Sequence, residues 1–165
     1  MRKVFLFLAC TLLLGISCSE QSTEFTDEQK AVIEQEVEEQ FREYVSVRNQ
    51  LNFDLWSKFW DSEDFMSANA LNFGALMSYN AWMDSVEISF ERRDRHHSEV
   101  KEIETNALTS EIVVLTSAGV FENWWSGNYH KLNGCETQIW KKHPEGWKII
   151  YVHESGWLIE GDLIN

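Results

Sequence analysis

The sequence predicts an α+β fold in which helices cover one face of an antiparallel sheet. In the first half of the chain, apolar residues recur at spacings of three and four, which is typical of amphipathic helices. From His97 onward the apolar period changes to two, as in strands that bury one face. Consecutive strands joined by short turns form an antiparallel sheet. The order of these two patterns therefore predicts three helices packed on a mainly antiparallel sheet.

Three helices are predicted ahead of the main sheet. Thr26, followed by Gln29 three residues later, forms a capping box that opens the first helix. Asn52 can cap a second, shorter helix, in which large aromatic side chains crowd one side. Such a stripe is most often core, although it can also contact a ligand if the core is hollow. Residues 65–77 predict two brief strands or a hairpin, and residues 79–93 return to helical spacing.

Four long strands are predicted to follow, over residues 97–108, 112–125, 136–142 and 147–156. Residues 126–134 are a predicted loop, and the only proline of the chain marks a tight turn before the last strand. Strict alternation along that strand places Trp147, Tyr151 and His153 on one face and Glu154 on the other. A buried phenol and imidazole each need a polar partner. This face is therefore predicted to be the wall of a cavity.

The N-terminus has the layout of a secretory signal. Arg2 and Lys3 precede an apolar run of eleven residues, too short to span a membrane, which takes about 20. Residues 14–18, Leu-Gly-Ile-Ser-Cys, resemble a lipobox, which implies acylation of Cys18. We expect residues 1–17 to be a lipoprotein signal peptide, 18–25 a tether and 26–165 a single domain, anchored by lipid in the bacterial cell envelope, on the periplasmic side or at the outer membrane. The alternative is an ordinary signal peptide with an incidental cysteine.

Charge and cysteine content exclude several classes of partner. Without Arg2 and Lys3 the chain has 12 basic and 27 acidic residues, a formal charge of −15, which is a poor match for nucleic acid. Cys135 would be the one free thiol, and we expect it to be buried and inert. The histidines lack metal-ligand spacing and no cofactor motif is present, so neither a metal nor a cofactor is predicted.

The order of elements and the closing stretch W-K-I-I-Y-V-H-E-S resemble the nuclear transport factor 2-like superfamily, in particular its SnoaL-like and ketosteroid isomerase-like branches, over residues 26–158. The resemblance implies a curved sheet wrapped into a cone with a pocket at its wide end, commonly in homodimers. Its members include isomerases, cyclases, dehydratases, hydrolases and binding domains, so fold alone does not choose a function. The isomerase pattern of one tyrosine and two aspartates is matched only by Tyr44, because the long strands offer no convincing aspartate.

Three residues are candidates for acid–base chemistry. His153 titrates near neutrality, and Tyr151 could donate a hydrogen bond beside it. Glu122 shares a mostly apolar row with Trp124, which would raise the pKa of its carboxyl. The alternatives are that His153 bonds a backbone carbonyl and that Glu122 lies at an exposed rim.

Aromatic residues are candidates for ligand contacts: Trp56, Trp60, Tyr79, Trp82, Trp124 and Trp140. Of the adjacent Trp124 and Trp125, one should enter the cone while the other faces outward or meets a partner subunit. The preferred hypothesis is an envelope lipoprotein whose cone binds a small, largely apolar or aromatic ligand, or a periplasmic partner. The alternative is a SnoaL-like enzyme acting on a carbonyl-containing small molecule.

Overall fold

The computed structural model describes residues 25–70 and 76–161, and it confirms the α+β class. The signal peptide, Cys18 and nearly all of the tether lie outside the described residues. The helices are α1 (Asp27–Asn49), α2 (Phe53–Trp56), the short 3-10 helix η1 (Ser57–Phe59) and α3 (Tyr79–Arg92). The strands are β1 (Ser67–Asn69), β2 (Arg93–Ala107), β3 (Ile112–Trp125), β4 (Asn128–His143) and β5 (Gly146–Glu160). None of the described helices is long and apolar enough to cross a membrane.

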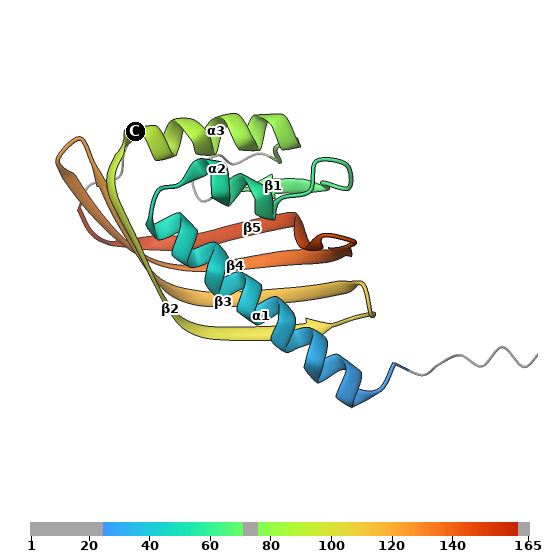
Figure 1. Ribbon diagram of the computed structural model, residues 1–165. Helices are drawn as coiled ribbons and strands as arrows, with labels where there is room; N and C mark the ends of the chain where they lie inside the picture. The colour runs from blue at the N-terminus through green and yellow to red at the C-terminus, as the bar shows by residue number, and fades with distance from the viewer. Residues whose placement is uncertain (1–24, 71–75, 162–165) are drawn as a thin grey trace, which may run out of the picture.

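The strands form one sheet in the order β1-β5-β4-β3-β2, in which only β1 runs parallel to its neighbour. The long strands bend together toward α3 at the end that carries the β3–β4 turn (Figure 1). Helix α1 crosses the hollow side of this curved sheet, and α2 and α3 lie on the same side. The core is the space between these helices and the sheet.

Helix α1 begins as the capping box predicts. The Thr26 hydroxyl accepts the backbone N–H of Gln29 at 3.2 Å, and Gln29 Oε1 accepts the backbone N–H of Thr26 at 3.0 Å. The side that faces the sheet is apolar over its first turns and ends in Tyr44 and Arg48, both buried. A buried arginine needs a counter-charge. This position on α1 therefore points to a polar site inside the fold.

Three strands are longer than the alternation predicts, and one of them, β5, continues to Glu160. β2 begins at Arg93, directly after α3, and β4 begins at Asn128, so most of the predicted loop 126–134 is strand. Ser126 and Gly127 both have positive φ, 48° and 83°, as a two-residue hairpin turn requires. The polar residues of 128–135 hid the strand, because apolar alternation is weak where the outer face is wet.

A β-bulge in β5 reverses the predicted faces of its second half. Trp140 pairs with Ile149 and Ile139 pairs with Tyr151, so Ile150 is an extra residue without a partner in the ladder. Ile149 and Ile150 are consequently both buried, and beyond them Val152 and Glu154 face the interior. The prediction that His153 faces a cavity is wrong: His153 is exposed on the outer face.

Candidate functional site

A cavity of about 350 Å³ lies between α1, α3 and the hollow face of the sheet, toward the end that carries the β3–β4 turn. This volume is at the lower end of the range for small-molecule sites, roughly 300–1,000 Å³. One part of its wall is apolar and mostly aromatic: Trp56, Trp82, Val86, Phe90, Phe121 and Trp125. The other part is polar and includes Arg48, Arg93, His96, Asn123 and Glu154. A wall of this kind can hold an apolar body and orient one polar group.

Arg48 is neutralised by a buried ion pair. Its Nη1 lies 3.0 Å from Glu136 Oε2, and the two side chains are only 7% and 1% exposed. Glu136 Oε1 accepts Gln138 Nε2 at 3.1 Å, and Gln138 Oε1 in turn accepts Trp140 Nε1 at 2.9 Å. Burial alone would lower the pKa of Arg48, but the charges of Glu136, Tyr44 and Glu154, together with the Glu136 hydrogen bond, outweigh burial and the pKa is raised. Arg48 therefore stays charged beside Glu136.

Glu154 is the carboxyl that the cavity leaves without a close partner. It comes from β5 just beyond the bulge and is partly buried, with its surface in the cavity wall. Burial and the charge of Glu136 raise its pKa to about 7, against the opposing charges of Arg48 and Arg93. Among the described residues it makes no side-chain hydrogen bond or ion pair. Glu154 can therefore gain or lose a proton near neutral pH.

Arg93 is a second cation in the cavity wall, and it pairs with no carboxylate among the described residues. Its guanidinium lies over the rings of Trp125 and Phe90, 4.8 and 6.0 Å from their centroids. Burial, and then the charge of Arg48, lower its pKa to about 10, so it remains charged at neutral pH. Within residues 25–70 and 76–161, no group forms a hydrogen bond with its Nε.

His96 is held neutral beside these charges. Its Nδ1 lies 2.7 Å from Asn123 Oδ1, which can only accept, so Nδ1 carries the proton. Its Nε2 lies 2.8 Å from the hydroxyl of Ser98, which donates to it. Burial and the charges of Arg93 and Arg48 lower the pKa of His96 to about 2. His96 therefore positions Asn123 and is not an acid–base group at neutral pH.

No protein-family model and no curated protein matches the chain. Solved structures do match it. A candidate dehydratase of the NTF2-like family from Streptomyces avermitilis is 12% identical, with 78% of this chain and 98% of that one covered at a TM-score of 0.70. A nuclear transport factor 2-like superfamily protein from Salmonella enterica serovar Typhimurium is 16% identical, with 76% and 92% covered at a TM-score of 0.66. The chain has the nuclear transport factor 2-like fold.

A third match shows how little that fold says about function. The association domain of CaMKII from C. elegans is 14% identical, with 78% of this chain and 99% of that one covered at a TM-score of 0.65. The nuclear transport factor 2-like fold thus occurs both in a candidate enzyme and in an association domain. The resemblance seen in the sequence is confirmed at the level of the fold. The fold alone does not determine the function, which depends on the residues of the cavity.

None of the three residues expected to carry acid–base chemistry lines the cavity. Because of the bulge, Tyr151 and His153 belong to the outer face. Glu122 accepts the hydroxyl of Tyr129 at 2.6 Å and lies 3.3 Å from Lys131 Nζ. The Tyr129 bond, then Lys131, lower the pKa of Glu122, whereas we expected it to be raised.

Of the six aromatic candidates, Trp56 and Trp82 line the cavity. Trp60 packs behind them, 5.1 Å from the ring of Trp56. Trp124 lies outside, between Tyr129 and Arg95, and its neighbour Trp125 is the one that enters the cone. The other two pack elsewhere: Trp140 is fully buried and donates to Gln138, and Tyr79 packs edge-on against Phe65 at 5.6 Å.

The charged residues of the cavity were not predicted, because the hydrophobic pattern of the sequence does not reveal that they face the interior. Arg48 closes the apolar row of α1, which was the one available signal, whereas Glu154 was placed on the outer face by an alternation that the bulge breaks. Cys135 differs from expectation as well, since it is exposed.

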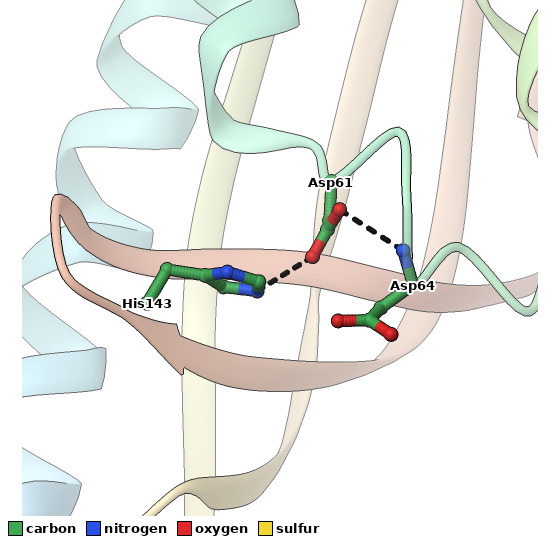
Figure 2. A group of neighbouring side chains, drawn as sticks. All are labelled: Asp61, Asp64 and His143. Atoms are coloured by element: carbon green, nitrogen blue, oxygen red, sulfur yellow. Dashed lines mark hydrogen bonds and ion pairs between the residues drawn. The ribbon is translucent and has the colours of Figure 1, made fainter.

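A second polar cluster lies at the opposite end of β4. His143 points at Asp61, with Nε2 and Oδ2 2.5 Å apart, and Asp64 lies beside them (Figure 2). Asp61 Oδ1 accepts the backbone N–H groups of Glu63 and Asp64 at 2.7 and 3.1 Å. These bonds and the charge of His143 lower the pKa of Asp61 although burial opposes them. Asp64 is also ion-paired with Lys141, so the cluster ties the loop after η1 to the β4–β5 turn.

Proposed function

We propose that this chain binds a small molecule in the cavity of its cone. The observation that carries the proposal is the cavity wall itself, where aromatic rings meet two ionisable groups, Arg93 and Glu154, that form no ion pair with any residue the structure describes. Unpaired charges inside a protein are costly and are found most often at functional sites. A wall needed only for stability would be apolar.

Native mass spectrometry of the purified protein tests this proposal. We expect a co-purified small molecule, and its loss when Val86, which lines the cavity, is replaced by Trp to fill it. A protein that carries no ligand and binds none from a panel of small aromatic molecules would refute the proposal.

The same spectra test whether the protein is a homodimer. Trp157 and Ile159, near the end of β5, are 65% and 49% exposed, and exposed large apolar side chains mark interaction surfaces. We expect a dimer mass that Trp157→Glu converts to a monomer mass. A monomer at micromolar concentration in the unchanged protein would contradict it.

A second candidate function is acid–base catalysis on a carbonyl-containing molecule. It is favoured by Glu154, because a carboxyl with a pKa of about 7 can act as a general base at physiological pH. Arg93 and the amide of Asn123 line the same cavity and could stabilise a developing oxyanion. If the co-purified ligand is turned over, Glu154→Gln should slow turnover about 100-fold or more. His153→Ala should not.

We also propose that the protein is exported and lipid-anchored through Cys18. The support is the sequence alone: a basic start, an apolar run and a lipobox-like stretch. The full-length protein should be found in the membrane fraction and carry an acyl mass on Cys18, and Cys18→Ser should release it. A soluble wild-type protein that is cleaved without acylation would establish the ordinary signal peptide instead.

A further inference from the structure

We infer that the ligand of this cavity is a monocarboxylic acid with an aromatic body, whose carboxylate pairs with Arg93 while Glu154 accepts a proton. The inference rests on the proposed binding function and names the chemical class of its ligand.

Among the described charged groups around Glu154, one buried cation has no counter-charge. On α1, Arg48 is paired with Glu136 of β4, and burial raises the pKa of Tyr44, which stays neutral. On β2, His96 is neutral and Arg93 is charged. The other titratable side chains that line the cavity are His130 and Cys135 of β4 and Arg92 at the exposed end of α3. With Glu154 protonated, the interior therefore carries the unpaired positive charge of Arg93.

Several hydrogen-bond donors of the side chains that line the cavity lack an acceptor among the described residues. Arg48 Nε, Arg93 Nε and Trp82 Nε1 are buried N–H groups without a partner among the described residues, and all three side chains line the cavity. The Trp82 side chain is itself only 4% exposed. A carboxylate has two acceptor oxygens and matches the planar fork of a guanidinium. A ligand carboxylate could pair with the guanidinium of Arg93, which lines the cavity.

Glu154 limits the ligand to one negative charge. An ionised Glu154 and the carboxylate of a ligand would both face Arg93, and two carboxylates that share one site cannot both remain ionised at neutral pH. Because the pKa of Glu154 is already near 7, it accepts the proton at little cost. A dianion would leave a buried charge without compensation. Binding of a monoanion should therefore take up about one proton.

The apolar wall selects the body of the ligand. Trp56, Trp82, Phe90 and Trp125 present rings on several sides of the cavity. Planar aromatic molecules pack well against such rings. 2-Naphthoate is therefore a suitable probe, and 2-naphthamide is its neutral counterpart of nearly the same shape.

The test measures binding of both probes to the full-length protein by calorimetry and tryptophan fluorescence between about pH 6 and 9. We expect 2-naphthoate to bind with proton uptake and to lose about tenfold in affinity per pH unit above about pH 7, since one proton is linked to binding. 2-Naphthamide should bind independently of pH. Glu154→Gln should bind 2-naphthoate without the pH dependence.

Arg93→Met should lose at least tenfold in affinity for 2-naphthoate and keep its affinity for 2-naphthamide. Arg95→Met is the matched control, because Arg95 lies two residues further along β2, is exposed and packs over Trp124 on the outer face. It should bind both probes as the unchanged protein does. Circular dichroism of each variant verifies that it is folded.

Two results would overturn the inference and leave the binding function standing: tighter binding of 2-naphthamide than of 2-naphthoate, or unchanged 2-naphthoate affinity in Arg93→Met. Binding of 2-naphthoate without proton uptake would overturn the role of Glu154. If neither probe binds and no ligand co-purifies, the inference and the proposed function fail together.

Discussion

Replacing Arg48 by Met should destabilise the fold far more than removal of an exposed arginine does. The Arg48–Glu136 pair has a 3.0 Å contact with both side chains 7% exposed or less. Without Arg48, the Gln138 amide is the one side-chain donor left to the Glu136 carboxylate in the part of the chain that the structure describes. Removing one partner of a buried pair costs about 3–5 kcal/mol, because the other charge is left uncompensated. We therefore expect the free energy of unfolding to fall by about that amount at pH 7.

The chain offers a matched control on the same helix. Arg42 pairs with Glu38 at 2.5 Å, but the two side chains are 61% and 37% exposed. Arg42→Met should cost less than about 1 kcal/mol. Urea unfolding, followed by circular dichroism, measures both variants, and Arg48→Met/Glu136→Met should lose clearly less than the sum of its single variants. If Arg48→Met costs no more than Arg42→Met, or if the double variant is additive, the pair is reached by water and the reasoning is wrong.

Three further predictions concern single side chains. The pKa of Glu154 is about 7 in the folded protein and near 4.5 in the unfolded chain, so the folded state binds more protons between these values and stability should fall as pH rises from about 4.5 to 7, by up to about 3 kcal/mol. Urea titrations at several pH values should show this slope in the unchanged protein and not in Glu154→Gln; equal slopes would contradict the assignment. Asp61→Ala should cost about 1–2 kcal/mol more than Asp61→Asn, because asparagine keeps an oxygen for the two backbone N–H groups, and equal thermal unfolding of the two variants would show that these bonds do not matter. His153→Ala should change stability by less than about 0.5 kcal/mol and leave ligand affinity unchanged, since the side chain is exposed; a selective loss of ligand would place the site on the outer face.

The fold could be predicted from the sequence wherever local chemistry decides it. The capping box at Thr26, the cap at Asn52 and the change of period after α3 depend on neighbouring residues, and each one is found in the structure. The predicted strand 112–125 matches β3 residue for residue. The start of β4 was missed because its first half is polar, and there the ladder with β3 determines the structure instead of the sequence pattern.

The site could not be predicted, because its faces depend on one residue. A bulge adds a residue to one strand and exchanges the two faces beyond it. Nothing in the run Ile149-Ile150 reveals which isoleucine is the extra one, since both are buried. The alternation was therefore read without a break, and it assigned His153 to the interior and Glu154 to the solvent. The correct assignment requires the pairing with β4.

The charges of the cavity follow two different rules. Arg48 and Glu136 neutralise one another, and their loss should affect the folded state more than anything else. Arg93 and Glu154 have no such partner among the described residues. Burial lowers the pKa of Arg93 and raises that of Glu154, so folding disfavours the charged form of both side chains. Replacing Arg93 by Met should consequently leave the stability unchanged or increase it, while carboxylate affinity is lost. A residue whose removal stabilises a protein but abolishes binding is one that is retained for function and not for stability. Arg93→Met should give this response and Arg48→Met the opposite one, which would distinguish the roles of the two arginines.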